Sequence, residues 1–303
     1  RDLRLLALRR EELSALSSLL REKANLFRDV AEHQERVMAY GPADYQDVLR
    51  VSIQADLLED RIADLELERD ELAVSLSALV FPERVPELDW SSWDLVRLGD
   101  IELPSQEALM AAVDRHPEIE RVRAMQRGAQ ASAEDALVQR TPGLTFSASW
   151  SIIEPYDMPM AGTGDGGRDV FMLGVSLPLP IVAAPYRYRA AHFEELGQAA
   201  AAEAGNARRR AEEEMRRRLL SIATEQARLE RFNRDLVPLA HDITEQLQVE
   251  LSHGAEEHTD YLLAVQQELL LQEQLIQSEY QIAREVIYID YLSAGALLSG
   301  GVQ

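Results

Sequence analysis

Apolar residues recur at every third or fourth position through residues 1 to 40 of this chain, with charged residues between them. This spacing predicts one face of an amphipathic helix, made by Leu3, Leu6, Leu13, Leu16, Leu20, Leu26 and Val30. Gly41 and Pro42 interrupt the pattern, because glycine readily adopts positive φ and proline cannot continue a helix. Asp44 is then placed to cap a second helix that extends to about Val80. A short connection between two long helices predicts an antiparallel hairpin.

The same arrangement of helix, glycine and helix recurs near the other end of the chain. Gly254 follows Gly41 by 213 positions (254 − 41), and Asp260 follows Asp47 at the same offset. Long helical patterns flank both glycines. The chain is therefore predicted to contain two internal repeats, each a helical hairpin.

The helical pattern before the second glycine covers about residues 186–252, which corresponds to roughly 100 Å of helix. A helix of this length is typical of a coiled coil or a helical tunnel. Pro238 lies inside it and is expected to kink it. The returning helix is very apolar and extends to about Leu292, after which Gly295 and the last residues look frayed.

Two segments of different character separate the repeats. Residues 81–104 are rich in proline and tryptophan and predict an ordered connector. Ser105 can cap a helix through Asp114, and Pro117 suits the first turn of another helix, where its missing N–H is no loss. The sequence Thr141-Pro142-Gly143 ends that helix.

A clear alternation with period two follows and predicts a strand. Its apolar positions are Leu144, Phe146, Ala148, Trp150 and Ile152, and its polar positions are Thr145, Ser147, Ser149 and Ser151. A loop rich in glycine, aspartate and proline comes next, and a second strand is expected from about Val170 to Leu177.

This strand pattern alone fits both a soluble sandwich and a membrane barrel. An isolated hairpin is not independently stable, and the sequence offers no further strands to complete a sheet. Strands from other chains or from residues outside this chain are therefore expected to complete a barrel. Its lipid face would consist of Leu144, Phe146, Trp150 and Ile152, with Trp150 and Tyr156 as interfacial aromatics.

Composition narrows the classes of function. The net charge of −22 argues against a nucleic-acid partner, which requires a basic face. Hydrophobic content of 46% excludes a disordered chain. The absence of cysteine excludes disulfides and thiolate metal sites. The sequence contains no run of 18 apolar residues, so no membrane-spanning helix is predicted.

Acidic residues gather around both glycine turns, and two interpretations of them stay open. These residues are Asp44, Asp47, Glu256, Glu257 and Asp260. Helix N-termini favour carboxylates, so these five residues fit a role as helix caps and as part of solvated helix faces. A ring of carboxylates at the mouth of a symmetric helical tube would instead attract cations.

Neither a metal site nor an active site is expected. His253 and His258 could meet near the second turn, but their spacing is no recognised ligand motif. No glycine-rich phosphate loop, catalytic Ser–His arrangement or HExxH-type pattern is present. The alternating arginines and glutamates of residues 208–218 predict a solvated helix face with i,i+4 ion pairs. We therefore expect no catalysis and no cofactor.

Several short segments, in their order along the chain, carry a resemblance to one protein family. They are His116-Pro117-Glu118-Ile119, Thr141-Pro142-Gly143-Leu144, Val175-Ser176-Leu177-Pro178-Leu179-Pro180, Leu236-Val237-Pro238-Leu239-Ala240 and the two Gly-x5-Asp-x-Leu turns. Through them the chain resembles the outer-membrane efflux proteins, the TolC-like channel-tunnels, over about residues 20–295.

This resemblance implies a fold, a location and partners. The fold would be mainly α, with long antiparallel coiled-coil hairpins in two internal repeats and a short β-hairpin that contributes to a trimeric transmembrane β-barrel. The protein would form a homotrimer among the lipids of the outer membrane of a Gram-negative-type cell, with a periplasmic helical portion. It would export small molecules, metal ions or proteins passively, docked on a periplasmic adaptor protein and an inner-membrane pump.

The resemblance also assigns residues to the closed periplasmic entrance. Those residues are Asp47, Asp260, Glu256 and Glu257. The turns at Gly41 and Gly254 correspond to the tips on which the adaptor docks. A further gate aspartate of some family members falls on Leu263 here.

The first repeat departs from the family, because it lacks a strand pair and most of the long helix before Gly41. Since the chain also opens inside a helical pattern, we expect it to be a fragment. The expected domains are residues 1–80 (first hairpin), 81–143 (connector and equatorial-type helices), 144–181 (β-hairpin), 182–294 (second hairpin) and 295–303 (C-terminal tail). The alternative is a soluble coiled-coil interaction protein or periplasmic adaptor, whose β element simply joins two hairpins.

Overall fold

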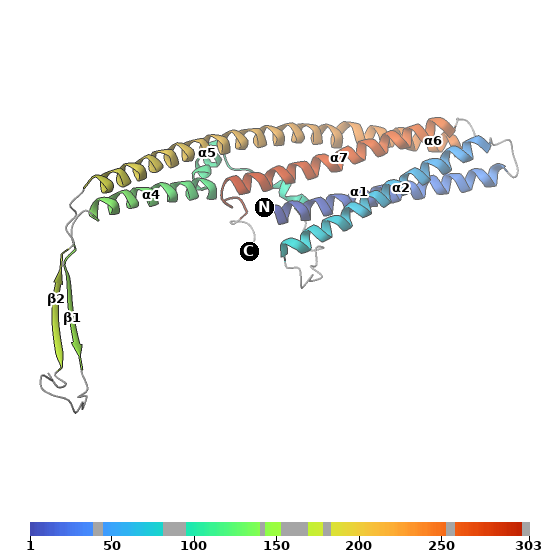
Figure 1. The fold of residues 1–303 in the computed structure, drawn as a ribbon. Coiled ribbons are helices and arrows are strands. Elements are labelled where there is room, and N and C mark those ends of the chain that lie inside the picture. Colours follow the sequence, from blue (N-terminus) through green and yellow to red (C-terminus); the bar gives the residue numbers. More distant parts are fainter. Residues whose placement is uncertain are drawn as a thin grey trace, which may run out of the picture. The chain divides into compact units, whose positions relative to one another are not determined.

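The computed structural model describes residues 1–38, 45–80, 95–139, 143–152, 169–177, 183–252 and 258–298. Long helices dominate these residues (Figure 1). The α-helices are α1 (Asp2–Met38), α2 (Tyr45–Val80), α3 (Gln106–Ala112), α4 (Pro117–Val138), α5 (Ala184–Arg231), α6 (Val237–Ser252) and α7 (His258–Leu292). The remaining elements are the 3₁₀ helices η2 (Leu95–Asp100) and η3 (Val113–Arg115), the strands β1 (Thr145–Ser151) and β2 (Val170–Ser176), and the π-helical segment η4 (Phe232–Leu236).

The helices and strands follow the sequence pattern closely. Ser105 caps α3 as predicted, since its side-chain oxygen accepts a hydrogen bond from the backbone N–H of Ala108 at 3.3 Å. Pro117 occupies the first position of α4. The expected disturbance at Pro238 takes the form of the π-helical segment η4, which directly precedes α6.

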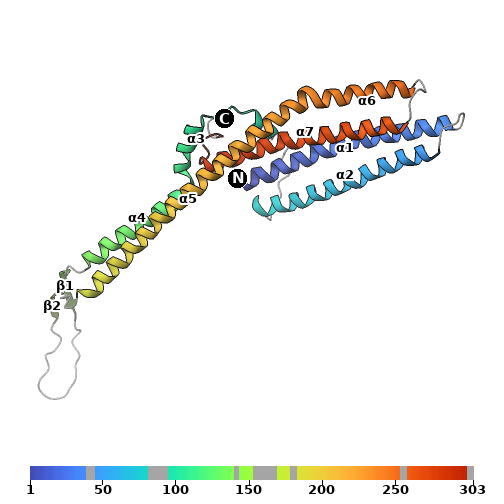
Figure 2. The same ribbon diagram turned by 90° about the horizontal axis from the view of Figure 1, so that it is seen from above.

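The chain divides into two compact units, one of residues 1–116 and 209–303 and the other of residues 117–208. In the first unit, α1 pairs with α2 and α6 pairs with α7 as antiparallel hairpins, which lie side by side in both views (Figures 1 and 2). Contacts between α1 and α7 join the two hairpins. The unit is therefore a layer of long helices with α1 and α7 at its centre.

Apolar clusters along α7 hold this layer together. The cluster nearest the start of α7 combines α1, α2 and α7 residues, namely Phe27, Ala31, Val51, Ala55, Tyr261, Leu262 and Val265. A second contains Leu20, Ala24, Ile62 and Leu269. A third, under η2, contains Leu8, Tyr280, Ala283 and Ile287. All three clusters contain residues of α7, so this helix is the one on which the other helices of the first unit pack.

The second unit contains α4, the first part of α5 and the β-hairpin. Gly197 of α5 lies against α4: a Cβ added to it would be 3.8 Å from the Cβ of Ala129. Near the other end of the pair, Arg189 of α5 donates a hydrogen bond to Gln139 at 3.3 Å. These contacts show that α4 and α5 pack directly on each other.

The β-hairpin has its apolar residues in register. β1 and β2 are antiparallel, and Phe146 pairs with Val175 while Trp150 pairs with Phe171. Directly opposite residues share a face, so the apolar positions of the two strands form one surface. On the other face Gly174 lies close to Ser147: a Cβ there would be 2.6 Å from the serine Oγ, so the serine side chain would have to move.

The expectation that residues from Gly295 onward are frayed is wrong for Gly295 to Leu298, the last residue that the structure describes. Gly295, at φ +81°, donates its N–H to the carbonyl of Asp290 at 2.8 Å. The buried carboxylate of Asp290 accepts the N–H groups of Leu297 and Leu298 at 3.2 and 3.0 Å and pairs with Arg4 at 2.9 Å. A buried acid thus caps and orders the chain beyond the helix, which the small residues of this segment did not indicate.

Candidate functional site

The residues predicted for the entrance fall at the ends of the two hairpins. Gly41, Gly254 and the acidic pair Glu256–Glu257 lie outside the described residues. Asp47 is the third residue of α2 and Asp260 the third residue of α7, so they occupy equivalent positions in the first turns of two helices. The side chain of Asp260 is exposed. Helix N-termini stabilise carboxylates at such positions.

The N-terminal parts of α2 and α7 lie next to each other. Arg50 donates a hydrogen bond to the hydroxyl of Thr259 at 3.4 Å, and Gln266 donates one to Gln54 at 2.7 Å. Tyr261 is buried in the apolar cluster at this end, and its burial and the nearby Glu268 carboxylate raise the pKa of its phenol. The structure thus joins the two predicted repeats at their glycine-turn ends.

The predicted lipid face is an uncovered apolar surface. Leu144, Phe146, Trp150 and Ile152 are exposed, as are Phe171, Leu173 and Val175 of the facing strand. Their exposed fractions lie between 53 and 75%. The opposite face is mixed, because Ser149 and Ser151 of β1 lie across from Met172 and Val170 of β2. An apolar face of this kind on a two-stranded sheet marks a surface that another medium or molecule covers.

A row of buried carboxylates on α7 is a feature that sequence reasoning missed. Glu268, Glu273, Glu285 and Asp290 are each 5% exposed or less. Each is paired with a cation from another helix: Lys23 at 3.4 Å, Arg61 at 2.8 Å, Arg218 at 3.0 Å and Arg4 at 2.9 Å. The sequence did contain a signal for these pairs: acidic residues at core-facing positions of a very apolar helix require partners. These pairs tie α1, α2 and α5 to α7.

The charged run in α5 is only partly the solvated face that was expected. Arg217 pairs with Glu213 at 2.5 Å, four residues earlier, as predicted. Arg218 pairs with Glu214 and also reaches the buried Glu285, with its guanidinium carbon 4.1 Å from the ring centre of Tyr288. One arginine of the run therefore fixes α5 on α7.

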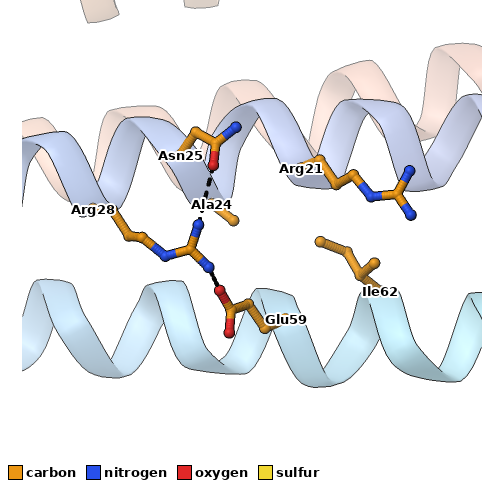
Figure 3. Close-up of a pocket in the computed structure, with 6 residues that line it drawn as sticks. All are labelled: Arg21, Ala24, Asn25, Arg28, Glu59 and Ile62. Atoms are coloured by element: carbon orange, nitrogen blue, oxygen red, sulfur yellow. Dashed lines mark hydrogen bonds and ion pairs between the residues drawn. The ribbon is translucent and has the colours of Figure 1, made fainter.

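A cavity of about 300 Å³ opens between α1 and α2 (Figure 3). Arg21, Ala24 and Arg28 of α1 line it together with Ile62 of α2. Arg28 pairs with Glu59, and Arg21 pairs in the same way with Glu66. Since both guanidinium groups already have carboxylate partners, the cavity presents no unbalanced charge for a ligand.

No group of three or more His, Asp or Glu side chains that could hold a metal ion occurs among the described residues. His253 lies outside them, and the position of the His258 side chain is not described. Within the same residues, no helix is both long enough and apolar enough to cross a membrane.

Solved structures of outer-membrane proteins have the same fold. The outer-membrane channel OprN is 16% identical with a TM-score of 0.75, over 98% of this chain and 66% of that one. The open-state MtrE outer membrane channel of Neisseria gonorrhoeae is 14% identical with a TM-score of 0.74, over 98% and 66%. The outer membrane protein VceC of Vibrio cholerae is 18% identical with a TM-score of 0.73, over 98% and 69%.

No family model matches the chain, and no curated protein matches it. The chain spans about two thirds of the length of the three outer-membrane proteins above. It has the fold of the TolC-like channel-tunnels, and the predicted resemblance is confirmed at the level of the fold. Mainly helical architecture with long hairpins and one small β-hairpin is the shared feature.

Proposed function

We propose that this chain is part of a protomer of an outer-membrane channel-tunnel that exports molecules passively across the cell envelope. The observation that carries the proposal is the apolar face of the β-hairpin, which remains exposed on a hairpin attached to long helices. Two strands cannot close a barrel, so strands from other copies or from residues outside this chain complete it. Phe146, Trp150 and Ile152 then face lipid, and Ser147 faces the water-filled interior.

Exposed apolar residues at the edges of the first unit support assembly as a homotrimer. On α2 they are spaced four residues apart and exposed, namely Tyr45, Leu49, Ile53 and Leu57. On α6 they are Leu239, Ile243 and Val249. These rows lie on different helices, so contact between α2 of one copy and α6 of the next would be heterologous, the type of contact from which closed rings are built. The ring encloses a tunnel between the helices.

The hairpin ends form the periplasmic entrance in this proposal. Asp47 and Asp260 line it, with Glu256 and Glu257 beside them, and the turns at Gly41 and Gly254 dock on a periplasmic adaptor protein. An inner-membrane pump would deliver the exported molecule through the adaptor. The adjacency of the N-terminal parts of α2 and α7, through Arg50 and Thr259, supports a common site.

Two neighbouring substitutions test the lipid face. Phe146→Arg places a charge on the face proposed to contact lipid, where arginine costs about 2–4 kcal/mol near the bilayer centre. Ser147→Arg is the matched control, because it adds the same side chain one residue later on the opposite face. We expect Phe146→Arg to abolish outer-membrane insertion of the full-length protein, measured by membrane fractionation, and Ser147→Arg to preserve it. Equal insertion of both variants would refute the assignment.

A further inference from the structure

The two strands and the helix ends next to them form a part of the chain without acidic residues. Residues 136–153 and 170–193 contain no aspartate or glutamate, although the whole chain has 53. The same two stretches contain three arginines, Arg140, Arg187 and Arg189. A chain with a net charge of −22 is therefore locally positive around its β-hairpin.

Chain connectivity places these arginines near one end of the β-hairpin. Thr145 and Ser176 are paired, so the start of β1 and the end of β2 lie at the same end. Six residues (139–144) join α4 to β1, and seven residues (177–183) join β2 to α5. Links of this length span at most about 28 Å. The last turn of α4 and the first turns of α5 therefore lie close to this end of the hairpin.

The side chains on these helix ends combine exposed apolar groups with positive charge. Tyr188 of α5 is 77% exposed, and Leu137 of α4 is exposed as well. Arg187 and Arg189 are also exposed. Arg189 donates to the amide oxygen of Gln139 at 3.3 Å, a neutral partner that leaves the positive charge in place. Tyrosine and arginine side chains of this kind are typical of the level at which a membrane meets water.

Acidic residues begin again one to two turns further along both helices. They are Glu134 and Asp135 on α4, and Glu194 and Glu195 on α5. Each strand has seven residues and is about 23 Å long, which is close to the apolar band of about 25 Å on a membrane barrel. A positive layer at the edge of such a band, with acids only beyond it, is complementary to a layer of lipid phosphates at that edge.

We propose that Arg187, Tyr188 and Arg189 contact the headgroups of anionic phospholipids at the rim of the barrel. Guanidinium groups bind phosphate as bidentate hydrogen-bonded pairs, and the tyrosine ring is stable where apolar and polar surroundings meet. Along the chain this surface follows the apolar face of the β-hairpin, so the two would contact the headgroups and the acyl chains of the same lipids. The inference rests on the proposed function, because it requires the hairpin to lie in a bilayer.

The lipid preference of the full-length protein in reconstituted vesicles tests this contact. Spin-labelled phosphatidylglycerol and phosphatidylcholine report which of the two lipids associates more strongly with the protein. We expect a preference of about fivefold for phosphatidylglycerol, because one basic residue beside an anionic surface contributes about this factor. Added salt should reduce the preference. Arg187→Gln with Arg189→Gln should abolish it, whereas Arg187→Lys with Arg189→Lys, which keeps the charge, should retain most of it. A full preference in the glutamine pair would overturn the proposal.

Two other arginines of the same helix provide a matched control. Arg208 and Arg210 are exposed and, like Arg187 and Arg189, two residues apart. They lie 21 residues (208 − 187), or about 31 Å, further along α5. This distance is well beyond the Debye length of about 8 Å at physiological salt, so Arg208→Gln with Arg210→Gln should leave the preference unchanged. An equal loss in both pairs of variants would contradict a local contact.

The same vesicles separate this contact from the proposed function. A wild-type protein that does not insert at all would contradict the proposed function. A wild-type protein that inserts without preferring phosphatidylglycerol would contradict the headgroup contact alone. Dissociation of the trimer in the Arg187→Gln and Arg189→Gln variant, with the lipid preference intact, would assign the surface to a neighbouring copy and also contradict it.

Discussion

The buried pair of Lys23 and Glu268 gives the sharpest test of how the helices are held together. Their side chains are 7% and 3% exposed, and the ammonium nitrogen lies 3.4 Å from the carboxylate oxygen. At an effective dielectric constant of about 20, two unit charges at this distance attract by about 5 kcal/mol. Lys23→Met removes the cation and leaves a carboxylate inside the α1–α7 contact.

The expected loss is about 3 kcal/mol, at the lower end of what breaking a buried pair costs. The loss is at the lower end because Glu268 keeps two other partners: Gln272 donates to its Oε1 at 3.0 Å, and His241 contacts the same oxygen at 3.3 Å. A loss of this size lowers the midpoint of thermal unfolding by about 6 °C in a protein of this length. Far-ultraviolet circular dichroism of the full-length protein measures that midpoint.

Two comparisons make the test decisive. Arg21→Met removes a cation two residues earlier, from an exposed pair with Glu66, and should cost less than about 1 kcal/mol. The double variant Lys23→Met with Glu268→Leu should recover most of the loss, because an apolar pair replaces the buried charges. If Lys23→Met is no worse than Arg21→Met, or if the double variant is less stable than Lys23→Met, the reasoning is wrong.

Two further predictions concern acidic residues. Asp47→Asn combined with Asp260→Asn should raise the leak current through the closed channel in planar bilayers by removing charge from the proposed entrance, with the exposed Asp64→Asn as control; a leak no larger than that of the control would contradict the assignment. Burial and the nearby Asp100 raise the pKa of Glu279, so the folded state holds this proton more tightly than the unfolded state does. Stability from this group is therefore full below the unfolded pKa of about 4.3 and is lost as pH rises through the folded pKa. In urea titrations Glu279→Gln should be more stable than the wild type at neutral pH and equal to it in acid, and equal stability at neutral pH would refute this.

Much of this fold could be predicted from the sequence, because its elements have strong periodic signals. Alternation from Leu144 to Ile152 gave the strand that the structure has, and spacing of apolar residues gave α1 and α7. Gly41 and Gly254 marked the breaks between helices because few other residues interrupt such regular patterns. The family resemblance then added the fold class.

The features that the sequence could not reveal depend on residues far apart in the chain. Glu268 pairs with Lys23 from the opposite end, and no local pattern identifies that partner. In the sequence, nothing distinguishes Asp290 from other acidic residues near a helix end. Only the structure shows that its carboxylate caps the chain by accepting the N–H groups of Leu297 and Leu298. Pro238 predicted a disturbed helix. The sequence did not indicate whether the disturbance would be a kink or a wide turn, because either can accommodate a proline.

The central claim is that this chain is part of a trimeric channel embedded in lipid, and its assembly state tests that claim most directly. Light scattering on the full-length protein, extracted from membranes, gives the mass of the particle with and without detergent. Our account predicts a trimer that requires detergent, because the apolar face of the β-hairpin needs lipid or a substitute for it. A monomer or dimer that stays dispersed without detergent would contradict it and favour a soluble coiled-coil interaction protein.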